Sequence, residues 1–328
     1  TLLASSAASD VYKRQMENSN KSGKSGRWLR LVVGLVARLP FWVLYRLSDF
    51  TFVVLYFLVR YRRKVVDDNL ASSFPDTSPS ERAKVRRRFY RNFSDYIFET
   101  IKLLHVSDDT MRRRMTFEGV DITDTYLRQG RQVIVYFSHC GNWEWAPSVT
   151  LWSSLTPGRD AEFCQIYRPL RSRAMDELML TLRGRFGSVS LSKRMAFLDL
   201  MRYRRQGMPA MTGFMSDQKP SHGDIIHVVN FLNHPTAVIT GTETAARRLD
   251  AAVVYWDMHK LSRGHYNIVT RLITDAPGQL PEGAITDRYA SLLAATIRRE
   301  PSIWLWTHKR WKNPVTMADD GSRIPYEY

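Results

Sequence analysis

The chain has 328 residues, of which 44% are hydrophobic and 24% are charged, so a disordered or collagen-like chain is excluded. Only 2 cysteines are present, which excludes a disulfide scaffold and any zinc ribbon with four thiolates. The 48 Lys and Arg residues outnumber the 32 Asp and Glu residues and give a net charge of +16. This surplus predicts an acidic partner, which is nucleic acid, an anionic membrane face or an acidic protein.

The first 27 residues are expected to lie outside the folded part of the chain. Residues 1–15 show no Met, no apolar run and no periodicity, and we interpret them as a translated, non-native leader. The stretch from Glu17 to Arg27 is polar and basic, so we expect a flexible arm there.

Residues 28–64 are predicted to form a hydrophobic membrane anchor. Trp28 to Val59 is strongly apolar and aromatic, and the basic cluster Arg60 to Lys64 follows it. Charged residues leave no uncharged run of about 18 to 20 residues, and Pro40 is expected to kink or split the segment. We therefore expect an embedded or interfacial anchor, whose basic flank suits anionic lipid on the cytoplasmic side. A buried core helix of a soluble domain is the alternative.

Residues 65–328 alternate between helical and strand patterns. Ser78 and Glu81 form a capping box around Pro79, which predicts a helix that runs to about Leu104. Apolar runs predict strands at 133–137, 162–167, 209–215, 225–231, 251–256 and 266–273. Helical patterns cover about 142–153, 170–186, 195–206, 240–249 and 285–298. This alternation predicts one α/β domain with a central, mainly parallel sheet flanked by helices.

The most informative segment is the strand 133–137 with the residues that follow it. His139 comes at the carboxyl end of this strand, where α/β sheets bind ligands and where a histidine can act as a general base. Gly141 allows a sharp turn, and Asn142 can cap the next helix, whose first backbone N–H groups can bind an oxyanion. Glu144 can hold the imidazole in the required tautomer. A histidine that only caps or packs is the alternative.

Other types of chemistry are less well supported. Cys140 lies next to His139, but adjacent side chains usually diverge, so we interpret Cys140 and Cys164 as small reduced fillers rather than nucleophiles. The 8 histidines are scattered and lack the spacing of a metal site. Because no Gly-rich phosphate loop is present either, we expect neither a metal nor a cofactor.

Five sequence blocks together resemble a known family. The segment SHCGNWEW, from Ser138 to Trp145, resembles the His-x4-Asp/Glu motif of the glycerolipid acyltransferase superfamily, in the form HxGNWE of the lipid A biosynthesis late acyltransferases. Four further blocks of that branch are matched in the expected order: Arg62-Arg63 with Asn69-Leu70 and Phe74-Pro75; Tyr167-Arg168-Pro169; Asp217-Gln218; and Trp304 to Lys312. The resemblance covers roughly Trp28 to Lys312, and Lys309 replaces an Arg while keeping its charge.

The resemblance implies a glycerolipid acyltransferase-like fold and a function. The family transfers a fatty acyl chain from an acyl carrier protein thioester to a hydroxyl of a lipid A precursor, at the cytoplasmic face of the bacterial inner membrane. His139 would then remove the proton of the acceptor hydroxyl, with Glu144 orienting it. No acyl-enzyme and no cofactor are implied.

The same resemblance suggests which residues bind substrate. These are Arg168, Asp217, Gln218, Asn142, Lys309 and Arg310. Arg168 follows a predicted strand and can bind a phosphate, although a surface arginine is equally compatible with its position. Asp217 also follows a strand and can hold either a basic residue of the active site or the acceptor sugar, with a strand-end turn as the alternative. Lys309 and Arg310 can contact phosphates or form a solvated basic tail.

Two alternative functions compete with this interpretation. One is an acyltransferase that acts on another glycolipid or on a glycerophospholipid. The other is a basic nucleic-acid-binding protein tethered to the membrane. The basic residues lie beside an apolar anchor and along a capped helix, without a nucleic-acid motif, so no nucleic-acid partner is expected. Anionic lipid and an acidic acyl carrier protein account for the charge of +16.

Overall fold

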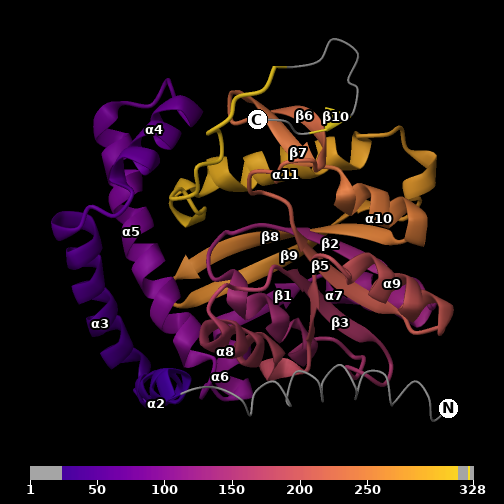
Figure 1. The fold of residues 1–328 in the computed structure, drawn as a ribbon, viewed down its shortest axis with the longest axis horizontal. Coiled ribbons are helices and arrows are strands. Elements are labelled where there is room, and N and C mark those ends of the chain that lie inside the picture. Colours follow the sequence, from indigo (N-terminus) through magenta and orange to yellow (C-terminus); the bar gives the residue numbers. More distant parts are fainter. Residues whose placement is uncertain (1–23, 317–323, 326–328) are drawn as a thin grey trace.

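A seven-stranded sheet forms the centre of the protein, and its strand order is β1-β9-β8-β2-β5-β3-β4 (Figure 1). The computed structural model describes residues 24–316 and 324–325. The strands are β1 (Met115–Glu118), β2 (Val133–Phe137), β3 (Glu162–Tyr167), β4 (Val189–Ser192), β5 (Ala210–Met215), β8 (Ala252–Ser262) and β9 (His265–Thr274). β2, β3, β4, β5 and β8 run parallel, whereas β9 is antiparallel to β8 and parallel to β1. The predicted α/β fold with a mainly parallel sheet is confirmed.

Helices cover both faces of this sheet (Figure 1). α10 (Gly241–Leu249) packs on β2 and α11 (Ala284–Arg299) packs on β8 and β9. On the other face, the 3-10 helix η2 (Trp143–Leu151) contacts β1 and β3, and α8 (Arg173–Arg183) contacts β4. The remaining elements of this part are α6 (Asp108–Arg114), α7 (Val120–Arg128), η3 (Gly184–Phe186), α9 (Ala196–Arg205), η4 (Pro277–Gln279) and η5 (Pro301–Ile303). This arrangement leaves the carboxyl ends of the parallel strands together at one edge.

Two sequence predictions differ from the structure in this region. The strand predicted at 225–231 is β6 (Ile225–Phe231), but it pairs with β7 (His234–Ile239) and β10 (Ile324–Pro325) in a separate sheet. Leu232 and Asn233 both adopt positive φ, which is the geometry of a two-residue hairpin turn, so β6 pairs locally with β7. The helix predicted at 142–153 is the 3-10 helix η2, which contains Pro147.

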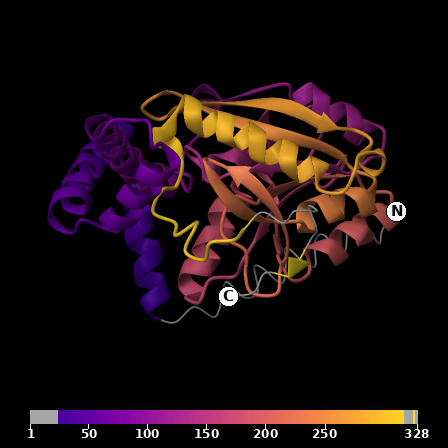
Figure 2. The same cartoon turned by 90° about the horizontal axis from the view of Figure 1, so that it is seen from above.

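The N-terminal helices lie at one end of the molecule, beside the sheet (Figure 2). They are α2 (Lys24–Arg38), α3 (Phe41–Val53), the π-helical turn η1 (Val54–Leu58), α4 (Arg63–Ser73) and α5 (Pro79–Lys102). Pro40 separates α2 from α3, as predicted, and the capping box of Ser78 and Glu81 is present at the start of α5. The predicted arm extends to Arg27, but α2 already begins at Lys24; residues 1–23 lie outside the described part.

α3 has one face on the protein and one face exposed. Leu44, Ser48 and Phe52 are buried, and the helix packs against α5. Large apolar side chains are exposed along α3 and η1, among them Trp42 at 70% and Phe50 at 69%. The helical stretch Phe41–Leu58 has the length and hydropathy of a membrane-crossing helix, and 22% of it is buried within the protein. The N-terminal segment is therefore a candidate anchor that also contributes to the core.

Candidate active site

Three predicted site residues meet at the edge formed by the carboxyl ends of the strands. His139 follows β2 by two residues, and Asp217 and Gln218 follow β5, which is the parallel neighbour of β2. Arg168 directly follows β3, on the far side of β5, and is exposed. The sheet topology thus brings His139 together with Asp217 and Gln218, although 78 positions separate His139 from Asp217.

Asp217 holds His139 through two hydrogen bonds. Its Oδ1 lies 2.7 Å from Nδ1 of His139, and its Oδ2 accepts the backbone N–H of His139 at 3.0 Å. Burial by itself raises the pKa of Asp217, but the charge of His139, these hydrogen bonds and the indole of Trp304 together outweigh burial and hold the pKa at about 2. Because the ionised Asp217 can only accept, Nδ1 of His139 carries a proton, and in the neutral form of the imidazole the lone pair is then on Nε2.

Gln218 occupies the reactive side of the imidazole. Its Nε2 lies 3.0 Å from Nε2 of His139, so the amide N–H donates to the lone pair. The side chain of His139 is 14% exposed, whereas that of Asp217 is 1% exposed. The imidazole is therefore more accessible than its carboxylate partner, and Gln218 contacts the nitrogen opposite the one that Asp217 holds.

Glu144 does not make the contact with His139 that the sequence suggested. Its carboxylate is buried and accepts hydrogen bonds from Nε and Nη2 of Arg183 at 2.7 and 2.6 Å. Trp143 also donates its indole N–H to Glu144 at 3.2 Å, and the Trp143 ring lies edge-on to His139 with 5.0 Å between the ring centroids. The correction has a physical reason, because a buried carboxylate is best compensated by a guanidinium that donates twice. Trp143 thus contacts both Glu144 and His139 and lies between them.

Asn142 also differs from its prediction. It makes no capping hydrogen bond to η2, and its fully buried side chain donates to Oε2 of Glu99 on α5 at 3.0 Å. Glu99 also accepts hydrogen bonds from Tyr45 and Tyr266, and its pKa is raised, mainly by burial. Asn142 consequently fastens the loop after His139 to α5, and we no longer propose it as a substrate contact.

Gly141 permits a close approach in the same loop. It adopts a φ of 58°, and a Cβ at this position would lie 3.0 Å from the Met258 side chain and 3.1 Å from Tyr266. Its backbone N–H donates to the carbonyl of Ile303 at 2.9 Å. Any larger residue would push the loop away from its support.

The C-terminal block makes hydrogen bonds to both Asp217 and His139. Trp304 donates its indole N–H to Oδ2 of Asp217 at 2.9 Å, and Leu305 donates its backbone N–H to the carbonyl of His139. Sequence reasoning placed Trp304 in a family block and did not predict this contact. A usable signal was present, because a buried tryptophan generally places its N–H on an acceptor. No comparable sequence pattern indicated Arg183 as the partner of Glu144.

The basic residues of the C-terminal block fall into two groups. Arg310 is buried and donates to the carbonyl of Ala237 at 2.6 Å, so its predicted role as a phosphate contact is corrected to a structural one. Lys309 is exposed and remains a candidate substrate contact, as does Arg168.

Cys140 is unsuited to nucleophilic catalysis. Its side chain is fully buried, and burial raises the pKa of the thiol far above its ordinary value. A thiol that is not ionised is a poor nucleophile. The prediction that Cys140 is a small reduced filler is confirmed.

The first and the last of the five family blocks contact each other. Arg62 donates to the carbonyl of Thr307, and Asn69 donates to the carbonyls of Trp306 and His308. These blocks lie more than 230 positions apart in the sequence, and the contacts join α4 to the C-terminal block.

A comparison with protein-family models gives a match over residues 15–313 to the bacterial lipid A biosynthesis acyltransferases. The chain belongs to this family. The match contains all five sequence blocks and confirms the resemblance based on them. A comparison with individually curated proteins gave no match. The protein is therefore an acyltransferase of lipid A biosynthesis, and a lipid A precursor is its implied acceptor.

Proposed function

We propose that the acyltransferase moves a fatty acyl chain from the thioester of an acyl carrier protein to a hydroxyl of a lipid A precursor, with His139 as the general base. The observation that carries this proposal is the pairing of His139 with Asp217. A buried, ionised carboxylate on Nδ1 fixes the tautomer in which Nε2 accepts a proton.

The proposed reaction begins when the acceptor hydroxyl displaces Gln218 and donates its hydrogen bond to Nε2 of His139. His139 takes the proton as the oxygen attacks the thioester carbonyl, and Asp217 stabilises the imidazolium that forms. The tetrahedral intermediate then expels the carrier thiolate, which receives the proton from His139. Protons balance over the cycle, and no covalent acyl-enzyme is required.

Glu144 is proposed to act as a positioning residue within the family motif. Its ion pair with Arg183 joins η2 to α8, and its hydrogen bond with Trp143 fixes the ring that borders His139. The pair therefore shapes one wall of the site instead of receiving a proton. Removing either partner would leave the other charge buried without compensation.

The proposed location is the cytoplasmic face of the bacterial inner membrane. The exposed apolar side chains of α3 and η1 support contact with the bilayer, and the +16 charge supports contact with anionic lipid and with an acidic carrier protein. Trp42 is among these exposed side chains, and tryptophan is enriched at membrane interfaces.

A mass-spectrometric transfer assay tests the proposed function. Purified protein in detergent is incubated with acyl carrier protein thioesters of several chain lengths and a tetra-acylated lipid A precursor. A mass gain of one acyl chain on the precursor is expected, and the most active donor gives the chain length. No gain with any of these donors, together with a gain on a glycerophospholipid or another glycolipid, would contradict the proposed acceptor.

A further inference from the structure

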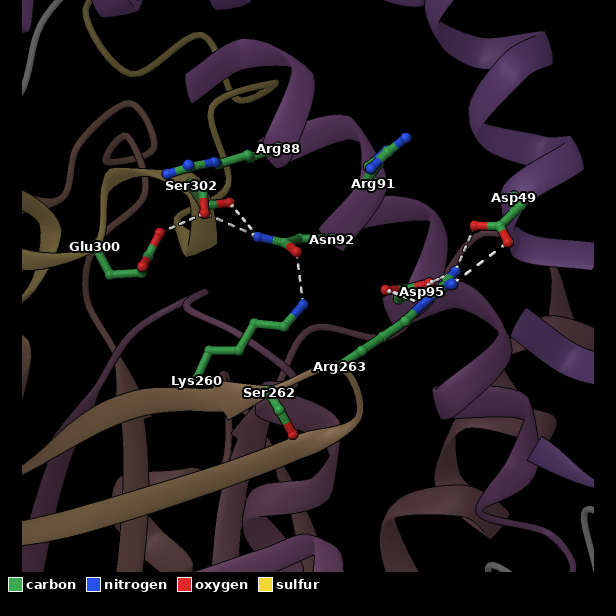
Figure 3. A pocket seen from close by; sticks show the side chains of 10 residues that line it. All are labelled: Asp49, Arg88, Arg91, Asn92, Asp95, Lys260, Ser262, Arg263, Glu300 and Ser302. Atoms are coloured by element: carbon green, nitrogen blue, oxygen red, sulfur yellow. Dashed lines mark hydrogen bonds and ion pairs between the residues drawn. The ribbon is translucent and has the colours of Figure 1, made fainter. Parts of the chain in front are cut away.

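A polar cavity of about 360 Å³ lies between α5, the tip of the β8–β9 hairpin and residues 300–302, and it contains none of the proposed catalytic residues (Figure 3). Asp49 of α3 also lines it, so the cavity borders the candidate anchor. Its lining carries four cationic and three acidic side chains. The way in which these charges are paired decides what the cavity can bind.

One wall is a single face of α5. Arg88, Arg91, Asn92 and Asp95 are spaced three, four and seven positions along the helix, so their side chains lie on one side of it. Arg88 and Arg91 are exposed. In the described part of the chain, neither guanidinium lies within ion-pair distance of a carboxylate; Arg91 lies over the ring of Phe52 at 5.2 Å.

Two of the three acidic residues share one guanidinium, which compensates one of their two negative charges. Arg263, at the hairpin tip, donates to Asp95 and to Asp49, each at 2.7 Å (Figure 3). Ser48 also donates to Asp95 at 2.6 Å. These contacts join the hairpin to α3 and α5. The third carboxylate of the lining, Glu300, accepts a hydrogen bond from Ser302.

Lys260 places a further cation in the cavity. Its ammonium group donates to the side-chain oxygen of Asn92 at 2.5 Å, and the amide of Asn92 donates in turn to the carbonyl and hydroxyl of Ser302 at 3.0 Å (Figure 3). An ammonium has three donors. Asn92 therefore holds Lys260 and Ser302 in place, while Lys260 retains donors for a ligand.

We propose that this cavity binds the phosphate group of an anionic lipid, as a site separate from His139. The four cations and three carboxylates of the lining leave a net charge of +1. Arg88 and Arg91 make no ion pair among the described residues, and guanidinium groups bind phosphate oxygens in pairs. The lipid chains of the ligand would contact α3, where the exposed Phe50 directly follows Asp49.

The cavity is also connected to the active site through the chain. Ser302 lines the cavity, the carbonyl of Ile303 accepts the N–H of Gly141, and Trp304 binds Asp217. A lipid held by its phosphate at Ser302 and Arg88 therefore lies beside the segment that supports the catalytic loop. Two sources of the phosphate are compatible with this chemistry: the lipid A precursor itself, or an anionic phospholipid of the surrounding bilayer.

A binding experiment tests the proposal without any acyl transfer. The full chain in zwitterionic detergent is titrated calorimetrically with dihexanoylphosphatidic acid, a soluble lipid with a phosphate monoester. We expect saturable binding that Arg88→Gln with Arg91→Gln weakens at least about tenfold, because two charge-assisted contacts are lost. The matched control is Lys84→Gln with Arg87→Gln, which removes two exposed cations at the same spacing on α5 outside the cavity, and it should stay within about twofold of wild type.

Three results would overturn the proposal. They are the absence of saturable binding, an equal loss in both double variants, and binding of inorganic phosphate as tight as binding of the lipid. Equal loss would show that general surface charge is responsible. Tight binding of inorganic phosphate would show a site for the free anion.

A second arm, which rests on the proposed function, identifies the source of the phosphate. If the precursor supplies it, Arg88→Gln with Arg91→Gln raises KM for the phosphorylated precursor but not for its dephosphorylated form. If the bilayer supplies it, the double variant abolishes stimulation by anionic phospholipid at unchanged KM. An active preparation that shows neither effect would contradict the proposal. Failure of transfer with every acceptor leaves the binding result intact, so the two failures are distinguishable.

Discussion

Trp304 and Asp217 are joined by a hydrogen bond of 2.9 Å between the indole N–H and Oδ2, and this bond connects the C-terminal block to the carboxylate that orients His139. Both side chains are buried. The position of the proposed base therefore depends on a residue 165 positions away from it in the sequence.

Trp304→Phe removes this donor while keeping most of the ring. We expect a loss of about 1 to 2 kcal/mol in the free energy of unfolding and a fall in kcat of about tenfold. Trp306→Phe is the matched control, because it removes an indole bond to the carbonyl of Pro301 outside the site. Steady-state kinetics and denaturant unfolding should show similar destabilisation but a much smaller loss of kcat for the control. Equal losses of kcat would argue against the proposed role of Trp304.

Asp217→Asn distinguishes the orienting residue from the motif carboxylate. The amide no longer stabilises the tautomer or the imidazolium, so kcat should fall by about 10³ to 10⁴ with little loss of folded protein. The measurement is kcat for each folded molecule, with circular dichroism as the control for folding. Near-normal turnover by Asp217→Asn would exclude Asp217 as the orienting residue.

Glu144→Gln should instead act mainly on stability. It leaves Arg183 buried without its counter-charge, which costs about 3 to 5 kcal/mol. We expect the folded fraction to keep a larger share of kcat than Asp217→Asn does, and Arg183→Gln should behave in the same way. A folded Glu144→Gln enzyme with no detectable turnover would show that Glu144 takes a direct part in proton transfer.

His308 gives the folded state a dependence on pH. Its pKa is lowered from 6.5 to about 4, mainly because burial disfavours the imidazolium. Between these two pH values the unfolded chain binds a proton at His308 that the folded chain does not bind. The contribution of His308 to the free energy of unfolding is therefore complete above pH 6.5 and is lost as the pH falls towards 4. After solvent screening the loss is about 1 to 2 kcal/mol. Denaturant unfolding at several pH values should show a shallower dependence for His308→Asn; an unchanged slope would contradict this.

Point substitutions test the anchor better than a deletion does. Removing α3 would also remove Leu44 and Phe52 from the core, and the protein would lose stability together with the anchor. Trp42→Gln with Phe50→Gln changes two exposed side chains instead, and it should lower binding to anionic vesicles at least about tenfold with little effect on folding.

The control for this experiment is Met195→Gln with Leu198→Gln, two exposed apolar residues at the start of α9. Vesicle sedimentation of the two double variants gives the comparison. Equal binding of both to vesicles would place the membrane contact elsewhere in the chain.

The sequence predicts the elements whose signals are local. The apolar run before His139 predicts β2, and the capping box at Ser78 and Glu81 predicts the start of α5. The 3-10 form of η2 was not predicted, because the apolar pattern around Pro147 suits an α-helix equally well. The separation of β6 from the main sheet was also missed, because pairing partners depend on turn geometry at Leu232 and on tertiary packing.

The same distinction applies to the site. His139 was identified because it follows a strand, and Asp217 mainly because its block resembles the family, with its place after a strand as support. One of the two roles considered for Asp217, holding a basic residue of the active site, is the one observed. The role given to Glu144 followed from its proximity to His139 in the sequence. The structure shows that its partner is Arg183 on α8, and no local pattern indicates that contact.

The measurement that tests the account most directly is single-turnover acyl transfer by wild type and by His139→Ala, followed by mass spectrometry of the lipid A precursor. Circular dichroism and thermal unfolding show whether the variant is folded. We predict one added acyl chain with wild type and none with folded His139→Ala over the same time. A folded His139→Ala protein that transfers at a near-normal rate would contradict the assignment of His139 as the general base.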